Sequence, residues 1–324
     1  MKFKITSLIT VALFLCLMSC QEKAPKQQNK WGSKEKNQIK ILTTTAMVAD
    51  LVKNVGGDLV DIKALIGTDI DPHSYQTKLG DAVYLQQADI IFYNGLHLEG
   101  KMEASLEQIK NKPVVAITSQ LTQQELLKPQ EAYNDHYDPH VWGDPTVWAS
   151  CIKPVLETLV NYDPKNEAIY KANANAYNQE LQELHLWAQN MIGSIPEQAR
   201  YLITSHDAFF YLGRAFNIQV EGIQGISTMA EASLKHQVYL VNLIKQQQIK
   251  TIFPESSVNP KAIKNLAEQS GAQVSSATLF SDAMGEPGDI AEFNGVTYDK
   301  GTYRGMLMHN IITITQGLSH STTD

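Results

Sequence analysis

The sequence predicts an α/β protein with two lobes, each a mostly parallel β-sheet flanked by helices, joined by one long rigid helix. Strand-like apolar runs alternate with helical patterns from residue 39 to residue 118, a long helical run follows, and the alternation then resumes. Such alternation predicts parallel sheets covered by helices. The expected boundaries are an N-terminal lobe at 39–162, a linking helix at 163–195 and a C-terminal lobe at 196–324.

The composition is that of a globular chain long enough for two domains. Its 324 residues are 43% hydrophobic and 19% charged, which excludes a disordered, collagen-like or coiled-coil protein. The net charge of −7 gives no basic surplus of the kind that drives nucleic-acid binding, so we expect no nucleic-acid partner. With 3 Cys, the chain has too few thiols for a disulfide scaffold or a thiolate zinc cluster.

The first lobe is expected to contain four strands and intervening helices. The strands are predicted at 39–44, 61–66, 88–94 and 113–118, and helices at 77–87 and 98–110. Thr45 follows the first strand and can cap a helix after it. Asp144-Pro145 and Asp163-Pro164 each place a capping carboxylate before a proline at the first helical position.

One uninterrupted helical run separates the two lobes. From Pro164 to about Met191 the chain has no glycine and no further proline, and it is rich in Ala, Gln, Glu and Leu. This run of roughly 28 residues is about 42 Å long as a helix. Gly193 and Pro196 end it. A helix of that length can span a whole domain and bridge two.

The second lobe repeats the alternation of strands and helices. Strands are predicted at 199–205, 217–223, 250–255 and 272–277, and helices at 207–216, 230–248, 260–270 and 300–318. The two halves of the chain are therefore alike in type, although they show no short-period repeat.

The amino terminus has the pattern of an export signal. Two lysines precede an uncharged apolar stretch from Ile5 to Met18, which at about 14 residues is too short to span a bilayer as a permanent helix. Residues 17–20 (Leu-Met-Ser-Cys) resemble the lipobox of bacterial lipoproteins, in which the cysteine is acylated. We therefore predict a lipoprotein signal peptide at 1–19, lipidation of Cys20 and a flexible polar tether at 20–38.

Polar side chains follow the carboxyl ends of predicted strands in both lobes, where open α/β sheets bind their ligands. They are His73 after the strand 61–66, His140 in the loops after 113–118, His206 at the end of 199–205, and Asp282 after 272–277. The first two belong to one lobe and the last two to the other. A cleft between the lobes would therefore be lined by three imidazoles and one carboxylate.

Three imidazoles and one carboxylate are the donor set of a first-row metal site. If the carboxylate binds through one oxygen, the site is tetrahedral and suits Zn²⁺. If it binds through both, the site is five-coordinate and also suits Mn²⁺ or Fe²⁺. The absence of a thiolate argues against copper(I) or a structural zinc cluster. The two Asp-Pro steps before His73 and His140 are expected to make the backbone there rigid.

Other residues are less strongly indicated as part of a metal site. His136 precedes His140 by four residues and could be an outer or capture ligand. Glu255 follows a predicted strand and could cap a helix or contact a metal ligand on the side away from the metal. Cys151 lies in an apolar helical run and is expected in the core. The remaining histidines are interpreted as ordinary: His97, His185, His236, His309 and His320.

These loops belong to a set of motifs in a fixed order. The motifs are residues 71–73 (Asp-Pro-His), 138–142 (Asp-Pro-His-Val-Trp), 204–209 (Thr-Ser-His-Asp-Ala-Phe), 222–227 (Gly-Ile-Gln-Gly-Ile-Ser), 254–258 (Pro-Glu-Ser-Ser-Val), 280–285 (Phe-Ser-Asp-Ala-Met-Gly) and 301–303 (Gly-Thr-Tyr). Over about residues 39–320, the sequence resembles the metal-binding solute receptors of manganese and zinc ABC importers, the TroA-like helical-backbone family.

The resemblance implies a receptor and not an enzyme. In this family two α/β lobes are joined by one rigid helix, and the metal lies between them. The family's four ligand positions fall on His73, His140, His206 and Asp282. The protein is expected to be exported and lipid-anchored to a bacterial membrane, at the outer face of the cytoplasmic membrane or a periplasmic face. There it would work as a monomer that delivers one metal ion to an ABC permease and its ATPase subunit.

The resemblance leaves the metal open between manganese and zinc, with Fe²⁺ less favoured. Zinc-dedicated members often carry a His-rich loop before the second ligand, whereas residues 127–138 hold only His136, which favours manganese or dual use. Some manganese members have Glu as the third ligand, whereas this chain has His206, which favours zinc.

Two other classes of protein are weighed beside the receptor. A secreted metal-dependent hydrolase would need an open metal position and a general base, for which Glu255 is the candidate, and the chain has no His-Glu-x-x-His helix. A surface adhesin with an incidental metal would bind its partner without the metal.

Overall fold

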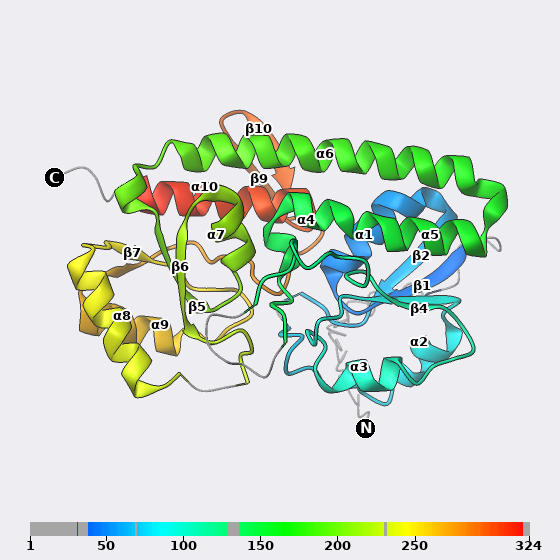
Figure 1. Ribbon diagram of the computed structural model, residues 1–324, viewed down its shortest axis with the longest axis horizontal. Coiled ribbons are helices and arrows are strands. Elements are labelled where there is room, and N and C mark those ends of the chain that lie inside the picture. The colour runs from blue at the N-terminus through cyan, green and yellow to red at the C-terminus, as the bar shows by residue number, and fades with distance from the viewer. Residues whose placement is uncertain (1–30, 32–37, 69, 129–135, 230–231, 320–324) are drawn as a thin grey trace, which may run out of the picture.

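The computed structural model describes residue 31 and residues 38–68, 70–128, 136–229 and 232–319. Two α/β lobes lie side by side beneath the long helix α6 (Glu167–Gly193), as Figure 1 shows. The fold class predicted from the sequence is confirmed. The predicted signal peptide and Cys20 lie outside the described residues. Within those residues, none of the helices has both the length and the apolar character that spanning a membrane requires.

The first lobe is built on a parallel four-stranded sheet in the order β2-β1-β3-β4. Its strands are β1 (Ile39–Thr43), β2 (Val60–Ala64), β3 (Ile90–Tyr93) and β4 (Val114–Ala116), and its helices are α1 (Ala46–Gly56), α2 (Asp81–Gln87) and α3 (Lys101–Leu106). Thr45 caps α1 as predicted, because its side chain accepts a hydrogen bond from the backbone N–H of Val48.

The second lobe has two pairs of parallel strands. They are β5 (Tyr201–His206) with β6 (Gln219–Gln224), and β7 (Thr251–Ile252) with β8 (Gln273–Val274). The backbone N–H of Phe253 donates to the carbonyl of Ile203 at 2.9 Å and joins the pairs. The strands expected at 250–255 and 272–277 are shorter than predicted. Pro254 has no N–H to continue the first, and the Ser275 side chain donates to the Ala277 carbonyl just after the second.

The helices of the second lobe pack around these strands. They are α7 (Phe210–Phe216), α8 (Leu234–Gln246), α9 (Lys261–Ser270) and α10 (Tyr303–Ser319). Helix α8 begins later than the predicted residue 230, because Ser233 is extended and its side chain accepts from the backbone N–H of His236. Helix α10 packs lengthwise against α6, so the last helix of the chain joins its lobe to the linking helix (Figure 1).

A β-hairpin lies in the second lobe between the predicted strand 272–277 and the predicted helix 300–318, in a segment to which no element was assigned from the sequence. It consists of β9 (Ile290–Phe293) and β10 (Val296–Asp299), which pair antiparallel. Asn294 and Gly295 form the turn with φ of 51° and 78°. Two consecutive positive φ angles are typical of the hairpin turn that favours Asn-Gly. The Asn-Gly pair was therefore a local signal for this hairpin.

The two Asp-Pro steps that precede the linking helix differ from each other. Helix α4 (Pro145–Ser150) has the predicted cap, since Asp144 accepts from the backbone N–H of Thr146 at 2.9 Å. At the second Asp-Pro step, a 3₁₀ turn at Pro164–Asn166 precedes α6. The Asp163 carboxylate makes no cap to the backbone there. It accepts instead from the side chains of Asn166 and Tyr170, which the 3₁₀ turn and the first turn of α6 bring close to it.

One hydrophobic core runs through both lobes and the linking helix. Buried positions on α6 recur every three or four residues: Tyr170, Ala174, Tyr177, Leu181, Leu184, Ala188 and Ile192. They belong to the same cluster as Val48 of the first lobe and Leu202 of the second. Cys151, after α4 and before α5 (Ile152–Tyr162), is fully buried in this cluster as predicted. A shared core of this kind limits the independent movement of the lobes.

Trp31 lies within the segment expected to be a tether, and it contacts the first lobe. Its indole Nε1 donates to the Asp61 carbonyl on β2 at 3.2 Å. Its ring meets Tyr84 of α2 edge to face, with the centroids 5.8 Å apart. The Lys63 ammonium lies 4.4 Å from the centroid of the same tyrosine. The contacts of Trp31 thus fix one point of the N-terminal segment on the edge of the sheet.

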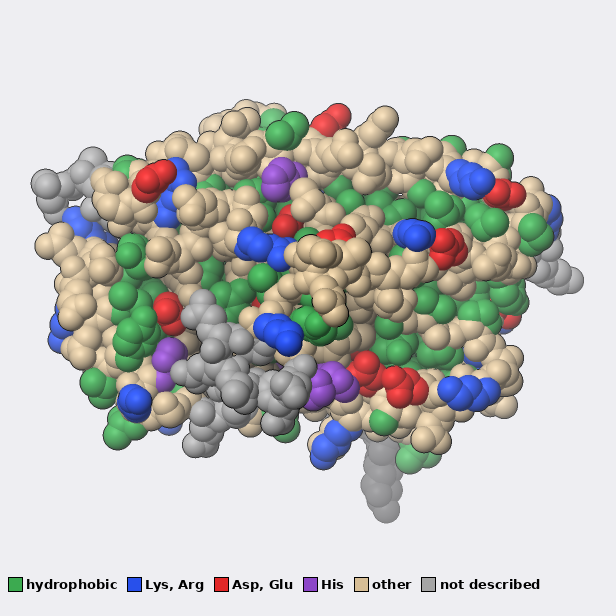
Figure 2. Space-filling view, in the orientation of Figure 1, with side chains coloured by type: hydrophobic (Ala, Val, Ile, Leu, Met, Phe, Trp, Pro, Cys, Tyr) green, Lys and Arg blue, Asp and Glu red, His purple; other side chains and the backbone are tan. Residues whose placement is uncertain are grey.

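The surface of the molecule carries charges of both signs. On the face shown in Figure 2, Lys and Arg side chains lie apart from one another, with acidic and neutral groups between them. Apolar side chains on this face show mainly as small areas between the polar groups.

Candidate metal site

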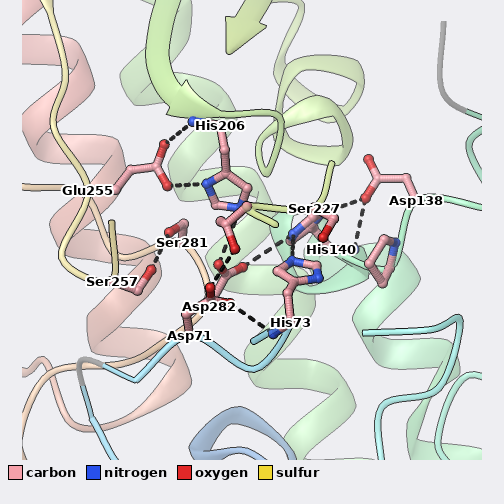
Figure 3. Close-up of polar contacts among 12 residues, drawn as sticks. Asp71, His73, Asp138, His140, His206, Ser227, Glu255, Ser257, Ser281 and Asp282 are labelled. Atoms are coloured by element: carbon pink, nitrogen blue, oxygen red, sulfur yellow. Dashed lines mark hydrogen bonds and ion pairs between the residues drawn. The ribbon is translucent and has the colours of Figure 1, made fainter. Parts of the chain in front are cut away.

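The loop between β2 and α2 positions His73. The backbone N–H of His73 donates to Asp71 Oδ1 at 2.8 Å, which closes a tight turn around Pro72. This turn directs the imidazole toward the second lobe (Figure 3). Of the four predicted site residues, His73 has the most solvent exposure.

A second Asp-Pro-His turn positions His140 immediately before a 3₁₀ turn at Val141–Gly143. Asp138 Oδ1 accepts from the backbone N–H of His140 at 2.9 Å and lies 2.7 Å from the ring Nδ1. The turn is held from both lobes, since Asn94 Nδ2 donates to the Pro139 carbonyl and the Tyr211 hydroxyl donates to the Asp138 carbonyl. His140 is fully buried.

His206 is the last residue of β5 and is fully buried. Glu255, just beyond β7, accepts from its backbone N–H through Oε1 at 2.9 Å. Glu255 Oε2 lies 2.5 Å from the His206 ring Nδ1. Of the two roles considered for Glu255 from the sequence, the structure therefore shows the second: its carboxylate contacts His206 and supports that residue.

Asp282 lies in the loop after β8 and is 2% exposed. The indole Nε1 of Trp142, from the first lobe, donates to the carbonyl of Ser281 at 2.7 Å. The Ser281 hydroxyl lies 3.1 Å from that of Ser257. The loop that carries Asp282 is thus fixed both within its own lobe and by the opposite lobe.

The four side chains predicted from the sequence converge between the lobes, as Figure 3 shows. One donor atom from each of His73, His140, His206 and Asp282 lies within 4.8 Å of all the others. The Nε2 atoms of His73 and His140 are 3.2 Å apart. The two oxygens of Asp282 each lie 3.2 Å from an imidazole Nε2, one from that of His140 and one from that of His206.

Several of these donor atoms are buried without a hydrogen-bond partner. They are His206 Nε2 and both carboxylate oxygens of Asp282. A buried polar atom without a partner is costly, by about 1–3 kcal/mol and more for a charged group. A cation coordinated by these atoms would satisfy all three, and the donor set fits a first-row divalent metal.

The carboxylates around the two buried histidines change their proton affinity. Burial lowers the pKa of His206, but the negative charges of Glu255 and Asp282 outweigh burial and hold it well above its usual range. Burial also lowers the pKa of His140, but Asp138 and Asp282 together raise it to about 9. Both rings therefore hold a proton strongly when no cation competes for their nitrogens.

The pKa values of the other two site residues, His73 and Asp282, are lowered instead. Burial lowers the pKa of His73 to about 4, with the neighbouring imidazoles adding to the effect. Burial raises the pKa of Asp282, but the charge of His206 and the close contacts with the His140 and His206 rings outweigh it and hold that pKa well below its usual range. At neutral pH the site therefore presents an ionised carboxylate and one neutral imidazole.

Of the histidines interpreted as ordinary, His97, His185, His236 and His309 lie outside the group of four, and His320 is outside the described residues. The His136 ring contacts the His97 ring in a tilted arrangement, with ring centroids 3.9 Å apart, and His97 Nδ1 lies 3.0 Å from Glu103 Oε2. His136 is thus outside the group of four side chains. His236 and His309 lie at hydrogen-bonding distance from the carbonyls of Gly222 and Thr278.

Sequence reasoning missed the part played by Asp71 and Asp138. Each stands two residues before a histidine and accepts its backbone N–H. The signal was present, because Asp-Pro-His occurs in both loops and an aspartate commonly bonds the backbone two residues on. The additional contact between Asp138 and the His140 ring depends on the side-chain arrangement and had no local signal.

Comparison with known proteins finds similarity to proteins that are named for metal binding or metal uptake. The family profile described as "Zinc-uptake complex component A periplasmic" (ZnuA) matches residues 41–317. The manganese-binding lipoprotein MntA of Bacillus subtilis (strain 168) is 36% identical over 292 residues, covering 89% of this chain and 92% of that protein. The zinc-binding protein TroA of Treponema pallidum (strain Nichols) is 37% identical over 284 residues, covering 86% and 88%.

A solved structure extends the likeness to three dimensions. The periplasmic zinc-binding protein TroA from Treponema pallidum superimposes with a TM-score of 0.79 at 36% sequence identity, and the match covers 87% of this chain and 99% of that one. The profile spans most of the chain, and both relatives exceed 30% identity over most of their length. The chain therefore belongs to the ZnuA family of metal-binding receptors.

Proposed function

We propose that this protein captures one divalent transition metal ion, Mn²⁺ or Zn²⁺, outside the cytoplasm and delivers it to the permease of an ABC importer. His73, His140, His206 and Asp282 are the proposed ligands. His73 and His140 come from loops of the first lobe, whereas His206 ends a strand of the second lobe and Asp282 lies in one of its loops, so the ion would be bound between the lobes. Binding there would draw both lobes toward one charge.

The observation that carries this proposal is the set of unpartnered buried donors. His206 Nε2 and both oxygens of Asp282 are buried, face one another and lack hydrogen-bond partners. A fold can tolerate such a cluster if a cation completes it, because the cation then replaces the lost interactions with water. The carboxylates behind two of the imidazoles support the same reading, since metal-binding histidines commonly give their other ring nitrogen to a carboxylate.

The arrangement of Asp282 supports use of either metal. Its two oxygens face different imidazoles at equal distances, so one or both can bind the ion. Binding through one oxygen gives the four-coordinate site of Zn²⁺, and binding through both gives the five-coordinate site that Mn²⁺ also accepts. The intrinsic affinity order favours Zn²⁺ at such a site.

Delivery to a membrane partner is inferred from the family. The related MntA and a related PsaA of Streptococcus pneumoniae are named as substrate-binding or manganese-binding lipoproteins. We infer the same arrangement here: export, a lipid on Cys20, a monomeric receptor, and an ABC permease with its ATPase subunit as partner. The lipobox at residues 17–20 supports the anchor.

The position of Glu255 supports binding without catalysis. A hydrolase would need a base free to activate a metal-bound water. Both oxygens of Glu255 are engaged by His206, and the residue is 3% exposed. The role proposed for this carboxylate is therefore to orient a ligand.

Metal-dependent stabilisation tests the proposal. Zn²⁺ and Mn²⁺ should each raise the unfolding temperature of the wild-type protein, because a ligand at 100 times its Kd stabilises by about 2.7 kcal/mol. His206→Ala and Asp282→Ala should lose most of this stabilisation. His97→Ala removes an exposed imidazole outside the site and should retain it. Unchanged stabilisation in both site variants would end the assignment, and native mass spectrometry with elemental analysis of protein from its own host would identify the metal.

A further inference from the structure

Among the described residues, the loop that carries His73 makes two side-chain hydrogen bonds to the opposite lobe. The Thr228 hydroxyl, in the loop after β6, donates to Asp71 Oδ2. The Thr68 hydroxyl donates to Glu286 Oε1, beyond Asp282 in the chain. The Asp71–Thr228 pair is partly buried, whereas the Thr68–Glu286 pair is exposed to water. Water competes with the exposed pair, so the partly buried pair is expected to hold the loop more strongly.

Asp71 connects the opposite lobe directly to a proposed ligand. Its Oδ2 accepts from Thr228, and its Oδ1 accepts from the backbone N–H of His73 at 2.8 Å. Figure 3 places Asp71 beside His73 at the edge of the site. Hydrogen bonds to a carboxylate are among the stronger ones in proteins. One carboxylate thus couples the position of His73 to the position of the second lobe.

The Thr228 loop is itself tied to the region of His206. Gln224 Nε2, at the end of β6, donates to the Thr228 carbonyl at 3.4 Å. The backbone N–H of Asp207, the residue after His206, lies 3.5 Å from the Gly225 carbonyl. The contact from Thr228 to Asp71 therefore joins the backbone beside one proposed ligand to the backbone beside another.

We propose that Thr228 is a positioning residue that keeps the lobes closed on the bound metal by holding the His73 loop through Asp71. The inference rests on the proposed function and assigns a further residue to that site. His73 is the most exposed of the four ligands, so it is the one best placed to leave first when the metal is released. Loss of the Thr228 hydroxyl should therefore speed metal dissociation and have little effect on association.

The test is the rate at which a chelator removes Zn²⁺ from the loaded full-length protein. Thr228→Val keeps the shape of the side chain and removes the donor, and we expect dissociation to become roughly tenfold faster. Thr228→Ser keeps a hydroxyl and should restore a rate close to wild type. Thr158→Val makes the same change on α5, where the hydroxyl bonds only the Pro154 carbonyl of its own helix, and should leave the rate unchanged.

Two further measurements separate positioning from general stability. The metal-free Thr228→Val protein should unfold at the wild-type temperature, and Thr68→Val should speed dissociation less than Thr228→Val does. An unchanged dissociation rate in Thr228→Val, a lowered unfolding temperature of its metal-free form, or a larger effect of Thr68→Val would overturn the inference. A wild-type protein that binds no Zn²⁺ would instead overturn the proposed function.

Discussion

Glu255 holds His206 at two points, one on the backbone and one on the ring. Oε1 accepts the backbone N–H at 2.9 Å, and Oε2 lies 2.5 Å from Nδ1. In the other lobe, one oxygen of Asp138 makes both contacts with His140, at 2.9 and 2.7 Å. Both arrangements leave the Nε2 atoms of the rings facing Asp282. The two buried imidazoles are thus oriented by the protein itself, independently of a bound ion.

Removing the charge of Glu255 is expected to weaken metal binding. In Glu255→Gln the amide oxygen can still accept from the His206 backbone, but the ring loses its anionic partner. Groups that hydrogen-bond the other ring nitrogen of a metal-binding histidine commonly contribute 10–100-fold to metal affinity. We therefore expect a loss of about that size for Zn²⁺. Isothermal titration calorimetry at pH 7 and pH 9 measures it.

The pH dependence makes this prediction specific. Glu255 also raises the pKa of His206, so at pH 7 the substitution removes part of the proton competition that opposes metal binding. The deficit of Glu255→Gln should therefore be larger at pH 9 than at pH 7. Glu157→Gln, on the exposed side of α5, is the matched control. An affinity equal to wild type at pH 9 would contradict the role assigned to Glu255.

Metal binding is expected to release protons at neutral pH. The pKa of His140 is raised from 6.5 to about 9 and that of His206 is raised well above 6.5, yet both rings must be unprotonated at Nε2 to bind a metal. His73 has a pKa lowered to about 4 and is already neutral. About two protons should therefore leave at pH 7, as measured by calorimetry in buffers of different ionisation enthalpy.

The same pKa shifts determine the stability of the metal-free protein. A histidine whose pKa is higher in the folded state stabilises that state fully below the unfolded pKa of 6.5. For His140 this contribution is lost as the pH rises from 6.5 through about 9. Metal-induced stabilisation should therefore grow across that window in thermal unfolding. Metal affinity that stays constant from pH 6 to pH 9, without proton release, would contradict the prediction.

The linking helix offers a test of the shared core. Leu184 on α6 is 1% exposed and packs in the cluster that includes both lobes. Leu184→Ala should lower the free energy of unfolding by about 2–5 kcal/mol, because the cavity left behind adds to the lost burial. Leu186, two residues along and 58% exposed, provides Leu186→Ala as the matched control with little expected effect. Chemical denaturation of both variants measures the difference, and equal stabilities would refute the packing assigned to α6.

Local signals in the sequence were sufficient for much of the architecture. Thr45 and Asp144 cap helices as predicted, because a cap depends on residues only a few positions apart. Asp163 has the same local pattern, yet its carboxylate bonds Asn166 and Tyr170. There the backbone cap is replaced by bonds to two side chains only three and seven residues along the chain, so the competing contacts are local as well. The Asn294-Gly295 hairpin was missed although its turn residues were visible.

The amino-acid sequence by itself determined the two-lobe α/β class and the four polar residues that follow strand ends, because apolar periodicity and loop position are local properties. The tertiary structure alone decided which groups distant along the chain support those residues. Glu255 lies 49 positions from His206, and Thr228 lies 157 positions from Asp71. Contacts over such separations form when strands and lobes pack, so no spacing along the chain encodes them.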